Sequence, residues 1–166
     1  MGRKIVVTSG KGGVGKTTLT ASLGIAIAET GKKVVLVDAD IGLNNLDVVL
    51  AVENKVVYDV LDVISGKCRL KQALIQDVDN PTLYVLPSAK IQDSPLITAC
   101  SFRNVVDALA LNFDFVIIDC PAGIDNGFHR AVSAATEAIV VTTPHISAVR
   151  DADKVLSILS GYCLMS

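Results

Sequence analysis

Apolar runs and stretches of helical spacing alternate along this chain. Five runs are apolar at successive positions and rich in β-branched residues, which is typical of strands that are buried on both faces of a parallel sheet. We expect strands at Lys4–Thr8, Val34–Asp38, Leu83–Leu86, Phe115–Asp119 and Ala138–Thr143. Such strands require helices on both sides of the sheet.

The segments between these runs supply the helices. Thr17–Thr30 carries leucine, alanine and isoleucine at helical spacing and is followed by Gly31, a residue suited to end a helix. Further helices are predicted at Val57–Ser65, Ser101–Leu111, Asn126–Ala135 and Ser147–Leu159. The fold class is therefore α/β, a doubly wound and mostly parallel sheet, in which ligands bind beyond the carboxyl ends of the strands.

Length and composition favour one domain over residues 1–166, because 166 residues, 51% of them hydrophobic, can bury one core. The last predicted helix runs into Gly161–Ser166 without a further strand, so we expect that C-terminal strands are missing; the alternative is a compact five-stranded domain. The net charge of −2 provides no broad basic field, and no nucleic-acid partner is expected.

The location expected from the sequence is the cytoplasm. Met1–Lys4 leads directly into a short apolar run, unlike a secretory signal, and no stretch approaches 18 apolar residues. The four cysteines form no C-x-x-C pair and are interpreted as reduced core residues: Cys68, Cys100, Cys120 and Cys163.

The strongest chemical signal is the glycine-rich loop between the first predicted strand and helix. Gly10-Lys11-Gly12-Gly13-Val14-Gly15-Lys16-Thr17 satisfies the pattern G-x-x-x-x-G-K-[ST]. The glycines allow backbone N–H groups to face phosphate oxygens, and the helix start adds partial positive charge. Lys16 can neutralise the terminal phosphates, while the Thr17 hydroxyl can bind Mg²⁺.

The same loop also fits a dinucleotide-binding pattern. Gly10, Gly12 and Gly15 match G-x-G-x-x-G, and Asp38 ends the next strand where such folds place a ribose-binding carboxylate. A dinucleotide-binding oxidoreductase is therefore an alternative. Lys16 and Thr17 favour a triphosphate with Mg²⁺, because pyrophosphate binding alone gives them no role.

Carboxylates at strand ends complete the predicted site. Asp38 and Asp40 follow the second strand, and Asp119 ends the apolar strand typical of a Walker B element. Asp38 and Asp40 could each hold a metal-bound water or orient the attacking water, and Asp119 is the candidate carboxylate on the Mg²⁺ side. The alternative is that Asp38 or Asp40 caps the segment that follows.

Several segments carry a family resemblance. The additional Lys11 in the loop resembles the deviant Walker A signature of the MinD/ParA ATPases. Four further segments resemble the MinD-type members, which act in placing the bacterial cell-division site: Asp38–Asp47, Val57–Val60, Asp119–Asp125 and Ser147–Asp153.

The resemblance implies an ATPase with ATP and Mg²⁺ as cofactors. It assigns catalytic roles to Lys11, Lys16 and Asp40, with Lys11 reaching the phosphates of the facing subunit in an ATP-dependent homodimer. Thr17, Asp38 and Asp119 would serve the metal. The nucleotide-binding residues would be Gly10, Lys11, Gly12, Gly13, Val14, Gly15, Lys16, Thr17 and Thr18.

The resemblance also implies partners. Family members recruit a MinC-like inhibitor and a MinE-like activator and bind the inner membrane peripherally through a C-terminal amphipathic helix, which we expect to be missing from the sequence given. The helix near Arg150, Asp151 and Asp153 resembles the partner-binding region. A ParA-like partitioning ATPase, or a fragment that only binds nucleotide, remains open, whereas an iron–sulfur relative would need a bridging cysteine pair.

Overall fold

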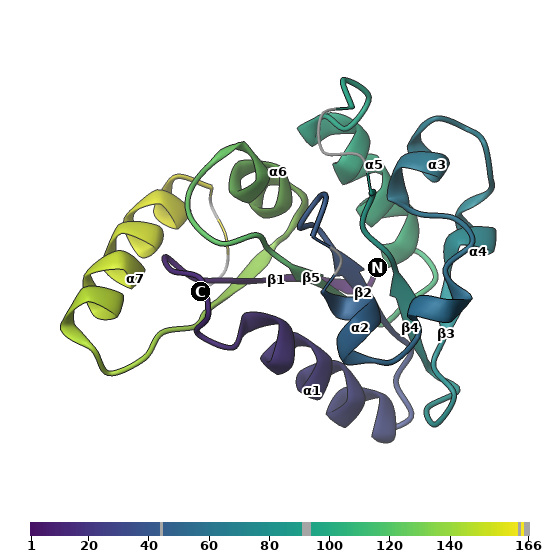
Figure 1. Cartoon of the computed structure of the whole chain (residues 1–166), viewed down its shortest axis with the longest axis horizontal. Helices are drawn as coiled ribbons and strands as arrows, with labels where there is room; N and C mark the ends of the chain where they lie inside the picture. Colours follow the sequence, from purple (N-terminus) through teal and green to yellow (C-terminus); the bar gives the residue numbers. More distant parts are fainter. Residues whose placement is uncertain (44, 91–93, 163, 165–166) are drawn as a thin grey trace.

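A single sheet forms the centre of the computed structural model, which describes residues 1–43, 45–90, 94–162 and 164. The strand order is β3-β4-β2-β5-β1-β6, and only β3 runs antiparallel to its neighbour. The strands are β1 (Arg3–Thr8), β2 (Val34–Asp38), β3 (Ile75–Gln76), β4 (Leu83–Leu86), β5 (Phe115–Asp119) and β6 (Glu137–Val140). The predicted doubly wound, mostly parallel sheet is confirmed (Figure 1).

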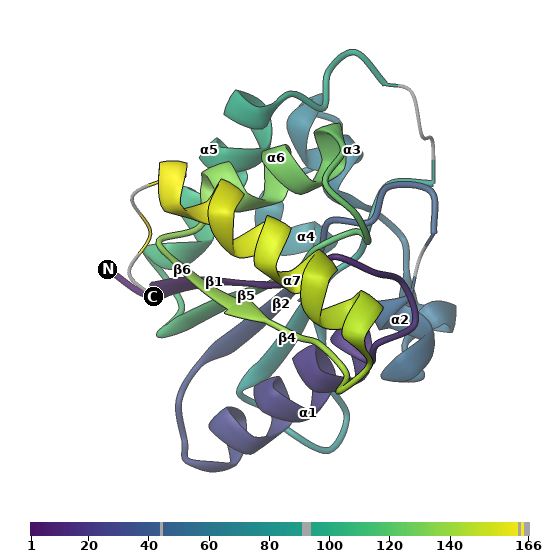
Figure 2. The same cartoon turned by 90° about the vertical axis from the view of Figure 1, so that its left-hand side faces the viewer.

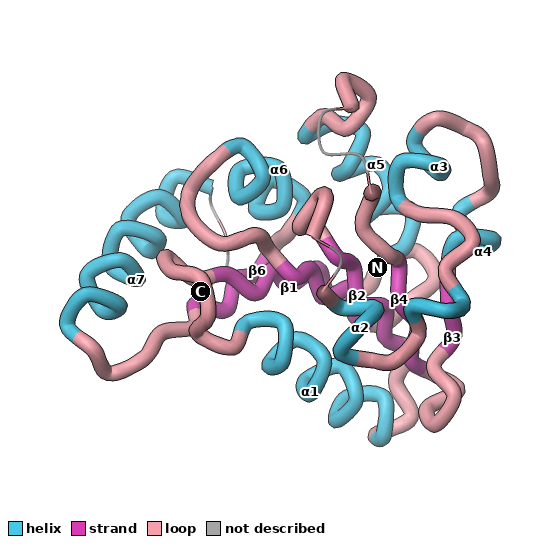
Figure 3. Tube along the Cα trace, viewed as in Figure 1, coloured by secondary structure: helices cyan, strands magenta, loops and turns pink. Residues whose placement is uncertain are grey.

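Helices cover both faces of this sheet (Figures 1 and 3). α1 and α2 pack on one face, and α3, α5 and α6 pack on the other. α7 contacts β6 and lies along the outer side of the molecule (Figure 2). The α-helices are α1 (Lys16–Glu29), α2 (Leu46–Val49), α3 (Val60–Ile64), α4 (Leu70–Ala73), α5 (Ala99–Ala110), α6 (Asn126–Ala134) and α7 (Ile146–Leu159), with 3-10 turns at Glu53–Lys55 and Ser160–Tyr162.

The central strand β2 shows why the sheet needs two helical layers. All five of its residues are buried. Val35 and Val37 belong to the core beneath α5 and α6, whereas Val34 and Leu36 belong to the core beneath α1. Successive side chains of a strand point to opposite faces, so an uninterrupted apolar run is buried only when both faces are covered.

Three short elements were absent from the sequence prediction, which gave five strands instead of six. The strand β3 and the helices α2 and α4 contain only two to four residues each. A segment of that length cannot display a period of its own, and its pairing partners decide its conformation.

Two predicted boundaries were wrong for identifiable reasons. The helix predicted from Val57 begins at Val60, because the Asp59 carboxylate accepts hydrogen bonds from the backbone N–H groups of Leu61 and Asp62 and so caps the helix there. The strand predicted to reach Thr143 ends at Val140, opposite Thr8, where β1 itself ends.

The interpretation of the cysteines as core residues holds only in part. Cys120 is buried, Cys68 is half-buried and Cys100 is exposed. Cys163 lies outside the described residues, as does Asn44 in the segment Asp38–Asp47 that carries the family resemblance.

In the part of the chain that the structure describes, every helix is too short or too polar to cross a membrane.

Candidate functional site

The glycine-rich loop turns between the end of β1 and the start of α1, as its pattern predicts. Gly13 and Gly15 have φ values of 76° and 93°, a left-handed conformation that residues with a side chain rarely adopt. Gly15 stands directly before α1, whose first turn has neither a side-chain cap nor an acidic residue. The first N–H groups of α1 are therefore available to a bound anion.

A cavity of about 390 Å³ lies over this loop, at the carboxyl ends of the strands. Its size is in the range typical of small-molecule sites. The loop, the start of α1 and the segments that follow β2 and β5 contribute to it, and its lining residues are Gly12, Gly13, Gly15, Lys16, Thr17, Thr18, Asp40, Asn45, Cys120 and Ala122.

Lys16 is a nearly buried cation at the bottom of this cavity. Its exposed fraction is 9%. Within the described residues, no carboxylate oxygen lies within 4.0 Å of its ammonium group. A buried charge without a partner costs free energy, so Lys16 favours an anionic ligand in the cavity that it lines.

Thr17 and Asp119 meet on one side of the cavity. The Thr17 hydroxyl donates to Oδ2 of Asp119 at 2.6 Å, and the Thr20 hydroxyl lies 3.4 Å from Oδ1. Burial raises the pKa of Asp119, while the hydrogen bond from Thr17 opposes this shift. Asp119 is 2% exposed and does not line the cavity, whereas Thr17, to which it is bonded, does. These oxygens are the donors that Mg²⁺ prefers.

Asp38 holds the loop that follows β2. Its Oδ1 accepts the backbone N–H of Asp40 at 2.9 Å, and its Oδ2 accepts those of Asn45 at 3.1 Å and Leu46 at 3.2 Å. Burial raises the pKa of Asp38 to about 7, against the effect of these hydrogen bonds. These contacts are those expected if Asp38 caps the segment that follows β2. A metal role for Asp38 stays a prediction.

Asp40 reaches the cavity as predicted. It lines the same wall as Asn45, and its backbone carbonyl accepts a hydrogen bond of 2.9 Å from Ser88. Desolvation raises the pKa of Asp40, whereas the positive charge of Lys16 lowers it. Its carboxylate is therefore close enough to the site to orient a water molecule beside a bound phosphate.

The remaining loop residues have different positions. Gly12, Gly13, Gly15 and Thr18 line the cavity, while Lys11 is exposed and Val14 lies outside the lining set. Gly10 packs against α7: a Cβ atom at this position would lie 2.4 Å from the carbonyl oxygen of Asp151. The loop thus fits between the cavity and α7 only with glycine at position 10.

Sequence reasoning did not assign Asn45, Cys120 and Ala122 to the site. All three line the cavity. A signal existed for the first two, because Asn45 follows the paired carboxylates of β2 and Cys120 comes directly after Asp119. Ala122 offers no chemical group, and only the turn after β5 places it there.

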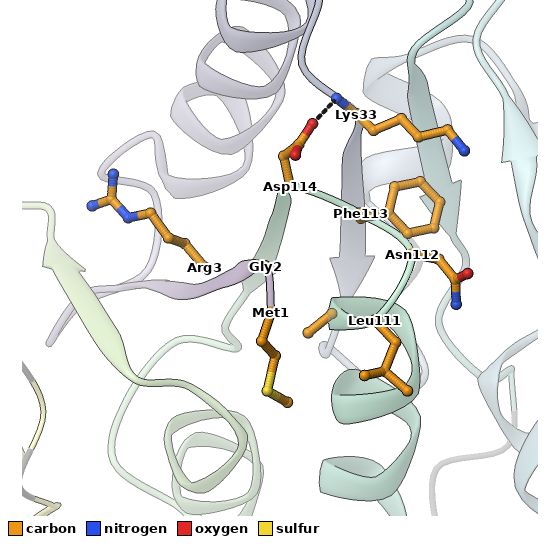
Figure 4. A pocket seen from close by; sticks show the side chains of 9 residues that line it. Met1, Gly2, Arg3, Lys33, Leu111, Asn112, Phe113 and Asp114 are labelled. Atoms are coloured by element: carbon orange, nitrogen blue, oxygen red, sulfur yellow. Dashed lines mark hydrogen bonds between the residues drawn. The ribbon is translucent and has the colours of Figure 1, made fainter.

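A second hollow lies at the amino ends of β1, β2 and β5, opposite the phosphate loop, and has different chemistry. Figure 4 shows Met1, Gly2 and Arg3 near the chain segment from Leu111 to Asp114, with the Lys33 backbone N–H bonded to Asp114 at 2.8 Å. It contains no glycine-rich turn or helix start. Over the described residues, no group of three histidine, cysteine or acidic side chains could hold a metal ion.

These features define a class of protein. A glycine-rich loop between a buried parallel strand and a helix, with a lysine and a threonine at the helix start and a carboxylate at the end of a neighbouring strand, is a phosphate-binding loop of the P-loop nucleotide-binding fold.

Comparisons with known proteins agree with this class. The AAA domain family matches residues 2–161. The septum site-determining protein MinD of Bacillus subtilis is 54% identical over 160 residues, which cover 96% of this chain and 60% of the relative. The chain spans about 60% of the length of such curated relatives.

Two solved structures share the fold at similar coverage. MinD of Pyrococcus horikoshii complexed with Mg-ADP has a TM-score of 0.88 and 38% identity, covering 99% of this chain and 67% of that chain. The MinC:MinD cell division protein complex of Aquifex aeolicus has a TM-score of 0.86 and 45% identity, covering 96% and 64%. The chain belongs to the AAA domain family, and within it to the MinD group.

Proposed function

We propose that this chain is the nucleotide-binding domain of a MinD-type ATPase, which binds and hydrolyses Mg²⁺-ATP. The carrying observation is Lys16, a nearly buried cation without an ion-pair partner in the described structure, at the bottom of a cavity formed by a glycine-rich loop. The relative complexed with Mg-ADP supports the choice of nucleotide and metal.

The residues of the cavity divide the work of phosphoryl transfer. The N–H groups at the start of α1 bind phosphate oxygens, and Lys16 balances their charge. Mg²⁺, when bound, supplies further charge neutralisation, and Thr17 with Asp119 would hold it on its side of the cavity. Asp40 orients the attacking water. Phosphoryl transfer needs little beyond such positioning and charge stabilisation.

We infer that the complete protein is an ATP-dependent homodimer in which Lys11 reaches the facing subunit. The complete protein acts in placing the bacterial cell-division site. Its partners are a MinC-like inhibitor and a MinE-like activator, the former supported by the MinC:MinD complex of a relative. The protein is cytoplasmic and becomes peripheral at the inner membrane when a C-terminal amphipathic helix is present.

Replacement of Lys16 tests the nucleotide site. Lys16→Ala should weaken Mg²⁺-ATP binding by about 10- to 100-fold, because a charge-assisted contact to phosphate is lost. Calorimetric titration measures the affinity, and circular dichroism checks that the variant folds. Lys32→Ala, at an exposed position beyond α1, is the matched control and should bind like the parent chain. Retained affinity in Lys16→Ala would exclude the assigned phosphate role.

A domain that binds nucleotide without dimerising is the second candidate, because the chain spans only about 60% of its relatives. Sedimentation with and without Mg²⁺-ATP separates the two. A dimer that forms only with nucleotide, and is lost in Lys11→Ala, supports the switch. A monomer under both conditions supports the binding domain.

A further inference from the structure

A third cavity lies far from the phosphate loop, at the amino ends of β2 and β5. It has a volume of about 490 Å³ and is enclosed by α4, β4 and α5. The residues that line it are Lys33, Arg69, Leu70, Lys71, Leu74, Tyr84, Ala108, Leu109, Asn112 and Phe113. The set contains three cations, and no acidic side chain.

The cations at the rim of this cavity are not neutralised by their surroundings. Within the described residues, no carboxylate lies within 4.0 Å of the charged groups of Lys33, Arg69 or Lys71. Of the acids nearby, Asp107 pairs with Lys4 at 2.7 Å, whereas the Asp114 carboxylate accepts the backbone N–H of Lys33 at 2.8 Å and lies beyond ion-pair distance of its ammonium group. The cavity lining therefore carries three cations that have no ion-pair partner among the described residues, which favours an anionic ligand.

The fold holds Arg69 at this rim through its backbone. The Arg69 N–H donates to Oε1 of Gln72 at 2.9 Å, which fixes the start of α4. This contact uses no donor of the guanidinium group, and all of its N–H groups stay available for a ligand. Leu70, on α4, and Leu74, directly after it, line the cavity between this rim and its apolar floor.

The floor of the cavity is aromatic and aliphatic. The rings of Tyr84 and Phe113 meet edge to face with centroids 5.3 Å apart. Phe113 is 8% exposed and Leu109 is 1% exposed, so both are fixed by the core. The Lys33 ammonium lies 5.7 Å from the Phe113 ring centre, and Figure 4 shows this side chain running beside that ring.

We propose that this cavity binds an amphiphilic organic anion: a carboxylate, sulfonate or phosphate head attached to an aromatic or acyl body. The head would contact Lys33, Arg69 and Lys71, and the body would cover Tyr84 and Phe113. An inorganic anion would leave the apolar floor in water, and a neutral apolar molecule would leave the cations unpaired. The volume suits a molecule of that kind.

Matched probes with one aromatic body test the charge requirement. Naphthalene-2-sulfonate should shift the backbone amide signals of Leu74, Tyr84 and Asn112 in NMR spectra of the full 166-residue chain, and the shifts should saturate. Naphthylmethylammonium, which carries the opposite charge, should leave these signals unchanged. Equal binding of the two probes, or shifts confined to other parts of the chain, would overturn the proposal.

Paired substitutions test the residues. Lys33→Gln combined with Arg69→Gln should weaken sulfonate binding by about tenfold, because two partly exposed ion contacts are lost. Lys32→Gln, beside the cavity but outside its lining, should bind like the parent chain. Undiminished binding in the double variant overturns the site. Binding to phosphatidylglycerol vesicles in place of the free sulfonate overturns the small-anion proposal in favour of a lipid surface.

The effect of the double variant on sulfonate binding should be independent of nucleotide binding. None of the substituted residues lines the cavity over the phosphate loop. Mg²⁺-ATP titration of the same double variant should therefore give the parent affinity, so that failure here and failure of the proposed ATPase function are told apart.

Discussion

The hydroxyl of Thr17, in the first turn of α1, lies 2.6 Å from the Asp119 carboxylate at the end of β5. The two residues are 102 positions apart in the chain and meet because β1 and β5 are neighbours with Val7 opposite Asp119. The strand register thus places the Asp119 carboxylate, the proposed metal-side group, directly beside the phosphate loop.

This contact predicts how the metal dependence responds to substitution. Thr17→Val keeps the shape of the side chain but removes its oxygen, so the gain in ATP affinity that Mg²⁺ provides should fall at least about tenfold. Titration with ATP in magnesium and in EDTA measures this gain. Thr17→Ser, which keeps the hydroxyl, is the control and should retain most of it. If the valine variant responds to Mg²⁺ like the parent, Thr17 is not on the metal side.

Replacement of Asp40 should reduce ATP hydrolysis while leaving ATP binding nearly unchanged. Asp40→Ala removes the carboxylate proposed to orient the attacking water but leaves the loop and Lys16 intact, so Mg²⁺-ATP should bind within about threefold of the parent while turnover falls about 100-fold. The turnover of the full-length protein is followed by phosphate release. Unchanged turnover would remove the catalytic assignment of Asp40.

Gly10 should couple the loop to α7. A Cβ at position 10 would lie 2.4 Å from the carbonyl oxygen of Asp151 and 2.6 Å from its Cβ, so Gly10→Ala must displace either the loop or α7. We expect a loss of about 1–3 kcal/mol in the free energy of unfolding and weaker nucleotide binding. Chemical denaturation and ATP titration measure the two effects.

The control for Gly10→Ala is a glycine with a comparable clash elsewhere. In Gly24→Ala the new Cβ would lie 2.6 Å from Cδ2 of Leu36, the movable end of a side chain. This variant should lose stability while keeping its ATP affinity. If Gly10→Ala also keeps its ATP affinity, the contact with α7 does not position the loop.

Asp38 should make stability depend on pH. Since burial raises its pKa from 3.8 to about 7, the folded chain retains a proton that the unfolded chain releases. Stability should therefore decrease as the pH rises from about 4 to about 7, by up to about 1.4 kcal/mol per pH unit, and change little above that window. The free energy of unfolding in EDTA, measured across this range, tests the slope.

Asp38→Asn is the variant for this effect. The amide does not titrate, so the slope should become shallower, although the raised pKa values of Asp40 and Asp119 leave a part of it. Asp79→Asn, at an exposed position, should keep the parent slope. An identical slope in the Asp38 variant would show that its carboxyl is not responsible.

Much of the fold follows from local pattern. The uninterrupted apolar run of β2 and the helical spacing after Lys16 are properties of neighbouring residues, and they determine a buried parallel strand and the helix that follows. The loop from Gly10 to Thr17 is equally local, since its left-handed glycines and its lysine act within one turn. The fold class and the phosphate loop therefore follow from the order of the amino acids alone.

Contacts between residues far apart in the chain depend on which strands are neighbours and on how the helices pack, and these follow only from the tertiary structure. The sequence places Asp38 at a strand end, but only the fold turns its oxygens toward the N–H groups of Asn45 and Leu46 and brings Asp40 to the cavity instead. The contact of Gly10 with Asp151 likewise joins residues 141 positions apart. Such contacts are set by which strands are neighbours and how helices pack on them, and no period in the chain encodes that choice.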